Sequence, residues 1–232
     1  MNQRRRLVLM PGLDGTGKLY TPIVPYLEPH FEMTFVTYPD LDSFSDYILC
    51  AQNQLPATPG FSLVAESFSG PVAMALMAHQ PEEIGPSVLS STFARSPLAT
   101  LTRMANSVPA EIFSIGALKD FCMDVYSSDE DDNSETQPLP LNMTEQLDGA
   151  LLKHRISVFS RIDVSALLPD IQAPILHLHG LQDRIVSEND AQVIQSSLPN
   201  VDRIDIEAPH LLLQTRPQQC SQLIFRHIYP DS

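Results

Sequence analysis

The feature that most constrains the fold is a regular alternation of short β-favouring runs with helical patterns. Each run is closed by Gly, Pro, Ser or Asp, as strands commonly are. The runs cover residues 7–10, 33–38, 61–65, 87–91, 175–179 and 203–207. Patterns of helical period lie between or after them, at 19–27, 44–54, 72–79, 189–198 and 218–228. This order predicts an α/β fold, in which helices cover both faces of a mostly parallel sheet.

The alternation stops between residues 93 and 169, where helical patterns follow one another without strands. These patterns cover 98–104, 112–126 and 143–159. We interpret the segment as a helical cap inserted into a single domain, whose core consists of 1–92 and 170–232. Within the cap, residues 124–137 are acidic and rich in serine, which favours a flexible solvated loop over a partner-binding tail.

The formal net charge of −14 disfavours nucleic acid and anionic membranes as partners, because both would repel the chain. No run approaches the roughly 18 apolar residues of a membrane span, so we expect a cytoplasmic protein without membrane insertion. The three cysteines, Cys50, Cys122 and Cys220, show no metal-ligand spacing, and we interpret them as reduced, buried and inert. The composition therefore favours a small neutral or cationic molecule as the partner.

The strongest local motif is the segment 61–70, in which an apolar strand pattern runs into Ser67. Ala65 and Ser69 stand two positions to either side, where the strict nucleophile-elbow motif has glycines. A serine on such a strand-to-helix turn projects its hydroxyl above the sheet, where a nucleophile is needed. The alternative register, with Ser69 as nucleophile, would put Pro71 where a small residue is required. A helix-capping serine is the remaining alternative.

The first strand pattern ends in a glycine-rich turn over residues 10–17. This turn lacks the Lys-Ser/Thr ending of a P-loop and the glycine spacing of a dinucleotide fold. Beside a nucleophile elbow, it would aim the backbone NH of Leu13 at an oxyanion, with the NH of Phe68 as the second donor. We interpret Asp14 as a turn or capping residue.

A general base and an orienting acid are expected at later strand ends, in the order Ser, acid, His. Asp183 follows the fifth strand pattern and His210 follows the sixth. Asp190 is close to the fifth pattern in sequence, but it belongs to a helical pattern. His177 and His179 alternate within a strand pattern, which is typical of packing residues. The sequence therefore predicts a catalytic triad of Asp183 and His210 with the elbow serine.

With these motifs in this order, the chain resembles the α/β-hydrolase superfamily from the 11–17 turn to the His210 loop. The resemblance implies that Ser67, His210 and Asp183 cleave an acyl ester or thioester through an acyl-enzyme, without a metal or organic cofactor. With only 14 Lys and Arg, the chain is poorly suited to the phosphates of CoA thioesters. Two alternatives remain, an acyltransferase with the same triad and a catalytically inactive binding protein of the same fold.

The same resemblance implies that the helical cap lies over Ser67 at the carboxyl edge of the sheet. Apolar side chains of the cap could then line an acyl pocket, although apolar residues at helical spacing more often pack a helix against its neighbours. The candidates for such a lining are Phe93, Leu98, Met104, Ile112, Phe113, Ile115 and Leu118.

Overall fold

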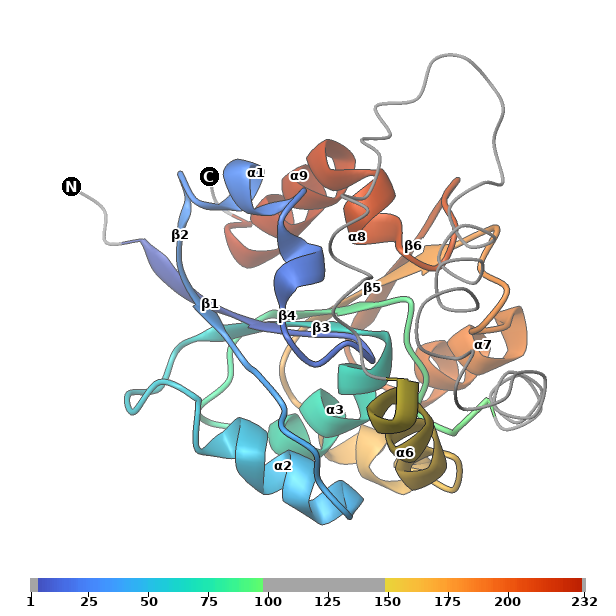
Figure 1. Ribbon diagram of the computed structural model, residues 1–232. Helices are drawn as coiled ribbons and strands as arrows, with labels where there is room; N and C mark the ends of the chain where they lie inside the picture. Colours follow the sequence, from blue (N-terminus) through green and yellow to red (C-terminus); the bar gives the residue numbers. More distant parts are fainter. Residues whose placement is uncertain (1–3, 98–148, 231–232) are drawn as a thin grey trace.

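The computed structural model of the chain describes residues 4–97 and 149–230. In this part of the chain, six strands form one sheet in the order β2-β1-β3-β4-β5-β6, and every neighbouring pair is parallel (Figure 1). The strands are β1 (Arg5–Met10), β2 (Phe31–Phe35), β3 (Ser62–Glu66), β4 (Ser87–Ser90), β5 (Ile175–Gly180) and β6 (Val201–Ile206). The predicted α/β class with a parallel sheet is confirmed.

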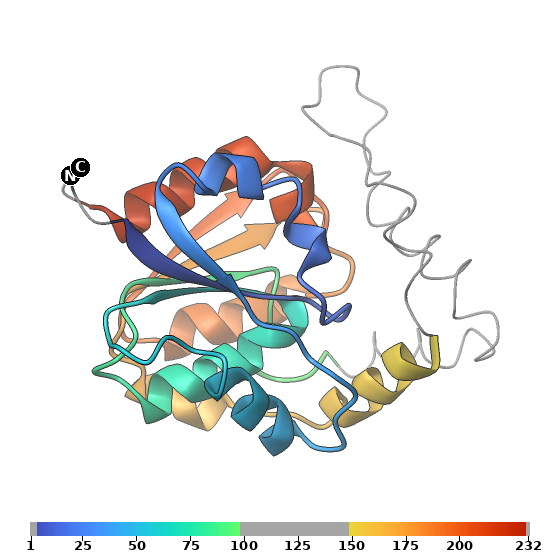
Figure 2. The ribbon, with the colours of Figure 1, turned by 60° about the vertical axis from the view of Figure 1, so that its left-hand side comes forward.

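Helices cover both faces of the sheet (Figure 2). One face carries α1 (Val24–Leu27), α8 (Leu212–Thr215) and α9 (Pro217–Ile228). The opposite face carries α2 (Phe44–Gln52), α3 (Gly70–His79), the 3-10 helix η4 (Ser165–Asp170) and α7 (Glu188–Ser197). Helix α6 (Gly149–Phe159) lies beyond this second layer, towards the edge where the strands end.

The alternation of side chains along β1 divides the apolar core into two layers. Val8 and Met10 belong to the buried cluster that includes residues of α2 and α3, whereas Leu7 and Leu9 belong to the cluster that includes residues of α9. Successive side chains of a strand point to opposite faces, so a strand covered on both faces is apolar throughout. This explains why the central strands occur in the sequence as short continuous apolar runs.

The structure corrects two of the predicted core elements. The expected helix at 19–27 is divided into the 3-10 helix η1 (Lys18–Tyr20) and α1, because Pro22 and Pro25 have no amide to donate in a continuous helix. The expected strand at 33–38 lies earlier, as β2, because beyond it the Tyr38 amide donates to the Gly15 carbonyl of the glycine-rich turn at 2.8 Å. Outside the insertion, the other elements lie within two residues of their predicted bounds.

The predicted insertion follows β4, and its described parts contain no strand. Residues 93–97 and 149–169 meet at an isolated bridge between Arg95 and Asp163, whose side chains form an ion pair of 2.9 Å. Helix α6 is the described end of the helix predicted at 143–159. The other predicted cap features lie outside the described residues, namely the helices at 98–104 and 112–126, the acidic loop at 124–137 and Cys122. The bounds of the cap therefore remain a prediction.

Cys220 is buried, but Cys50 is only partly buried, so the expectation of a buried thiol is wrong for Cys50. Helix α2 turns Tyr47 and Ala51 into the core, which leaves Cys50 at the side of the helix. Both thiols are free. Within residues 4–97 and 149–230, no helix has both the length and the apolar character needed to cross a bilayer.

Candidate active site

Ser67 lies on a sharp turn between β3 and α3, at the start of the 3-10 helix η2 (Ser67–Ser69). Its φ of 48° lies in the left-handed region, which a residue with a Cβ adopts only where its surroundings enforce it. Thr92 contributes to that enforcement, since its Oγ1 donates a hydrogen bond to the Ser67 carbonyl at 2.6 Å. This strained serine between a strand and a helix has the geometry of a nucleophile elbow.

Gly70 is a residue of the elbow that the sequence motif did not single out. A Cβ on Gly70 would lie 1.8 Å from Thr92 Oγ1, so a residue with a side chain does not fit there. Ala65 and Ser69, the small residues that the motif indicated, are fully buried. The Ser69 hydroxyl donates to the Pro11 carbonyl, which directs it away from a nucleophilic role. The sequence signal for this close approach was a glycine three residues after Ser67, where helix α3 begins.

His210 and Asp183 continue a hydrogen-bonded series from Ser67. Asp183 follows β5 and His210 follows β6, so both lie at the edge of the sheet where β3 ends in Ser67. His210 Nε2 is 2.8 Å from Ser67 Oγ, and His210 Nδ1 is 2.8 Å from Asp183 Oδ2. The structure therefore brings together the three side chains that the sequence predicted as a triad.

Two backbone amides hold the second oxygen of Asp183. Its Oδ1 accepts hydrogen bonds from the amides of Ile185 at 2.8 Å and Val186 at 2.9 Å. The Asp183 side chain is 0% exposed and that of His210 is 5% exposed. With Oδ1 fixed by the amides, Oδ2 faces the imidazole and gives the ring a single orientation.

Two opposing effects set the pKa of His210. Burial lowers the pKa, because an imidazolium loses its hydration, whereas the Asp183 carboxylate and, more weakly, Glu66 stabilise the charged ring. The carboxylates outweigh burial and raise the pKa of His210 above its ordinary value. An imidazolium cannot accept a proton from Ser67, so chemistry that uses His210 as a base would decline as the pH falls through this raised pKa.

The glycine-rich turn after β1 lies directly beside Ser67. A Cβ on Gly12 would be 3.9 Å from the Cβ of Ser67. Asp14 Oδ2 accepts hydrogen bonds from the amide of Thr16 at 2.9 Å and from its hydroxyl at 2.5 Å. Asp14 is thus a turn residue, as the sequence indicated.

The two predicted oxyanion donors, the amides of Leu13 and Phe68, are not used in the fold of the described residues. The Leu13 amide donates to none of these residues. Phe68 is the second residue of η2, and the first amides of a helix have no acceptor within it. Within the described residues, both amides are therefore available as hydrogen-bond donors to a bound molecule where the turn meets the elbow.

No protein-family model and no curated protein matches this sequence, but solved structures match its fold. An enol-lactonase from Burkholderia xenovorans LB400 has a TM-score of 0.80 at 18% identity, over 98% of this chain and 92% of its own. Carboxylesterase CesB from Bacillus subtilis has 0.76 at 16% identity, over 100% and 86%. A hydrolase from Pseudomonas aeruginosa PA01 has 0.78 at 18% identity, over 98% and 91%. The chain has the α/β-hydrolase fold.

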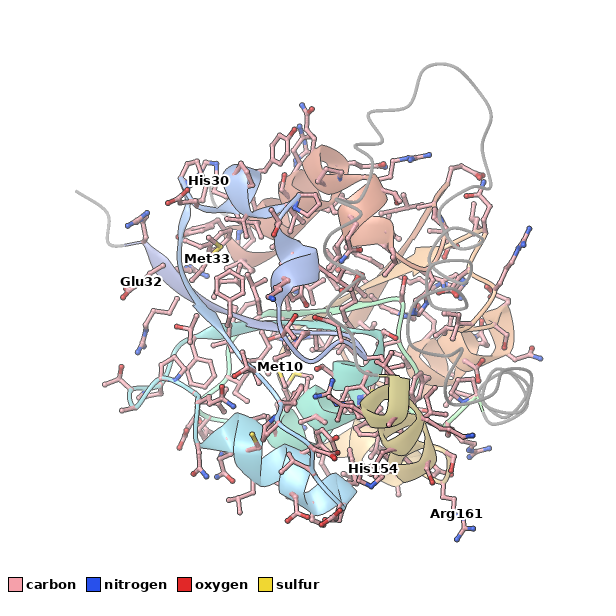
Figure 3. All side chains as sticks on the ribbon, in the orientation of Figure 1. Met10, His30, Glu32, Met33, His154 and Arg161 are labelled. Atoms are coloured by element: carbon pink, nitrogen blue, oxygen red, sulfur yellow. The ribbon has the colours of Figure 1, made fainter. Side chains whose placement is uncertain are left out.

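Other histidines of this α/β-hydrolase fold have structural contacts of their own. His177 and His179 are buried on β5, where burial lowers the pKa of both and keeps them neutral in the core. His154 on α6 contacts Asp40 at 2.7 Å, and the ring centre of His30 is 4.5 Å from that of Phe225, with the two rings tilted by 52°. Figure 3 labels both histidines. Within the described ranges, no group of three His, Cys, Asp or Glu side chains is arranged to hold a metal ion.

Glu66 is a buried acid next to the elbow serine of this α/β-hydrolase fold, and sequence reasoning missed it. It is 1% exposed, its Oε2 accepts from Gln214 Nε2 at 3.0 Å, and its Oε1 has no partner among the described residues. Burial raises the pKa of Glu66 to about 7, and the contacts with Gln214 and His210 offset only part of that effect. The signal for its burial was its place at the end of a wholly buried strand.

We expect Glu66→Gln to stabilise the protein increasingly as the pH rises. Below the ordinary glutamate pKa of 4.5 the acid is protonated in both folded and unfolded chains, and above about 7 the folded chain carries a buried carboxylate. The wild type therefore loses stability between these values, and the advantage of Glu66→Gln should grow by about 2 kcal/mol from about pH 5.5 to about pH 8. Urea unfolding at both pH values measures it. Exposed Glu82→Gln is the control, and an advantage independent of pH would contradict the assignment.

Proposed function

We propose that this chain is a serine hydrolase that cleaves a carboxylic ester through an acyl-enzyme. The observation that carries the proposal is the continuous hydrogen-bonded series from Asp183 through His210 to a conformationally strained Ser67. The same fold occurs in an enol-lactonase and in a carboxylesterase. Since a lactone is a cyclic ester, these neighbours favour an ester over other acyl substrates.

In the first step, Ser67 Oγ attacks the acyl carbonyl while His210 Nε2 accepts the hydroxyl proton. Asp183 holds the imidazole with Nδ1 protonated, so Nε2 is the atom that receives the proton, and it stabilises the imidazolium that forms. The negative charge moves to the carbonyl oxygen, where the amides of Leu13 and Phe68 can donate to it. His210 then returns the proton to the departing alkoxide, and the alcohol leaves.

In the second step, water replaces the alcohol and the same residues act in reverse. His210 Nε2 takes a proton from water as the water oxygen attacks the acyl-enzyme carbonyl. Collapse of the second tetrahedral intermediate breaks the bond to Ser67 Oγ, which recovers its proton from His210 and releases the acid. Every proton is accounted for by these side chains and water.

A small buried apolar cluster lies beside the catalytic loops. It consists of Phe93, Ile185, Val186 and Leu211. Ile185 and Val186 follow Asp183 closely, and Leu211 is the residue after His210, so the cluster adjoins the triad along the chain. Phe93 is the one predicted pocket residue with a described position, and the other six lie outside the described residues.

The proposal predicts that the purified chain hydrolyses simple esters. A series of p-nitrophenyl esters of increasing acyl length, a set of lactones and matched acyl-CoA thioesters would be compared by kcat/KM, together with labelling by a fluorophosphonate. We expect esters or lactones to be preferred over CoA thioesters, and one label per chain on Ser67. Acyl transfer to an added alcohol in place of hydrolysis would identify an acyltransferase. Folded protein with neither turnover nor label would identify a binding protein.

A further inference from the structure

Arg155 is a buried cation that the insertion contributes to the core. It lies on α6, is 1% exposed, and is the largest fully buried side chain among the described residues. Its Nη1 donates hydrogen bonds to the carbonyls of Leu13 at 2.8 Å and Asp14 at 2.7 Å. Its Nη2 donates to the carbonyls of Tyr38 at 2.6 Å and Pro39 at 3.4 Å. Backbone carbonyls thus surround the guanidinium.

Burying a guanidinium in a protein core is energetically unfavourable. Desolvation disfavours the charge unless its N–H groups are paired, and an apolar side chain of similar size would avoid that penalty. No carboxylate in residues 4–97 or 149–230 forms an ion pair with Arg155, and its Nε has no partner there. The hydrogen bonds that it does make therefore indicate its role, and two of them go to consecutive carbonyls of the turn beside Ser67.

The guanidinium is packed directly against this turn. Gly15 has a φ of 66°, and a Cβ on it would lie 2.5 Å from Arg155 Nη1. The Gly15 amide donates to the Gly12 carbonyl at 3.0 Å, so the carbonyl of the Gly12–Leu13 peptide points into the turn. A planar trans peptide directs its C=O and N–H to opposite sides. The N–H of that peptide, which belongs to Leu13, must therefore point out of the turn.

We propose that Arg155 is a positioning residue for the oxyanion turn: by fixing the carbonyls of Leu13 and Asp14, it holds the Leu13 amide ready beside Ser67. The inference rests on the proposed function, in which this amide binds the oxyanion. Donors that are fixed before reaction stabilise developing charge without reorganising, and this is the condition that Arg155 provides. In this proposal α6, the described end of the insertion, is a part of the catalytic framework.

The test compares Arg155→Met, Arg155→Lys and Arg161→Met in the full chain. Arg161 follows α6 and has an exposed side chain that extends away from the fold, so its replacement removes the same charge without touching the turn (Figure 3). Each protein is titrated to completion with a fluorophosphonate, which counts the reactive serines. The kcat and KM for one ester are then expressed per titrated serine.

We expect Arg155→Met to lower kcat per titrated serine by about 100-fold, as the loss of an oxyanion donor does, with KM changed less than about threefold. Arg155→Lys should lose about tenfold, because an ammonium lacks the planar fork that reaches four carbonyls. Arg161→Met should stay within about twofold. A merely structural role for Arg155 would lower the number of titratable serines and leave kcat per serine unchanged.

A kcat per titrated serine within about twofold of wild type in Arg155→Met would overturn the inference while the serine hydrolase stands. If the wild type is neither labelled nor active, the proposed function fails, and hydrogen exchange at the amides of residues 12–17 decides the role of Arg155 alone. Exchange at least about tenfold faster in Arg155→Met than in Arg161→Met would support its hold on the turn. Equal exchange would overturn it.

Discussion

Replacing Ser67 with alanine should lower kcat for ester hydrolysis by about 10⁶-fold, the scale of loss for a serine nucleophile that acts as a unit with its base. The substitution removes the only hydroxyl that His210 Nε2 contacts among the described residues, at 2.8 Å. The fold should persist, because alanine is no larger than serine and the substitution removes only the hydroxyl group. Saturating kinetics with a p-nitrophenyl ester measure the loss, and fluorophosphonate labelling should disappear with it.

The matched control is Ser69→Ala, which removes a hydroxyl two residues away. The Ser69 hydroxyl donates to the Pro11 carbonyl and lies 3.2 Å from the Tyr38 hydroxyl, so it supports the turn and does not face His210. The loss of one buried neutral hydrogen bond should reduce activity by less than about tenfold. If Ser69→Ala abolished labelling and Ser67→Ala did not, the register of the nucleophile would be wrong.

Replacing Asp183 with asparagine should lower activity by about 10⁴-fold near neutral pH, as the corresponding change does in a well-characterised serine protease triad. The amides of Ile185 and Val186 donate to Asp183 Oδ1, so they will select the oxygen of the asparagine. Its NH₂ group then faces His210 Nδ1 and favours the tautomer that carries its proton on Nε2. That tautomer cannot accept the proton of Ser67. The ratio of kcat/KM between variant and wild type measures the effect.

Asp190→Asn is the control for this prediction. Asp190 accepts from the Ser187 amide at 2.9 Å in the capping box of α7, which confirms that it belongs to the helix. A change at this helix end should alter the rate by less than about threefold, under roughly 0.7 kcal/mol of barrier. A crippled Asp190→Asn with an unaffected Asp183→Asn, both folded by circular dichroism, would show that the wrong acid was chosen.

The sequence predicted the candidate triad because each of its members depends on local pattern and chain order. Ser67 follows a buried strand, and Asp183 and His210 follow later strands, and parallel strands all end at one edge of the sheet. Helix α7 was also predictable, since its periodic face and its capping residues agree. The prediction of one helix at 19–27 was wrong because Pro22 and Pro25 have no amide donors. The spacing of apolar residues carries no information about this loss of donors.

Arg155 and Glu66 were not predictable, for a different physical reason. Both side chains are ionisable, and such side chains are rarely buried, so the hydrophobic pattern of the sequence predicts that they are exposed. Their roles arise from partners far away in the chain: Arg155 binds the Leu13 carbonyl 142 residues away, and Glu66 binds Gln214 148 residues away. Burial and partners of this kind exist only after distant parts of the chain have come together.

Strands β4 and β5 pair in register although the whole insertion lies between Ser90 and Ile175. The entropy of closing a chain loop grows only with the logarithm of its length, by about 0.6 kcal/mol for each doubling. The connection between β4 and β5 can therefore accept insertions of very different lengths with little loss in the stability of the sheet. Non-local pairing is also slow to form. Ser67 and His210 are 143 residues apart and can meet only after β4 and β5 have paired. Activity should therefore be among the last properties that a refolding chain acquires.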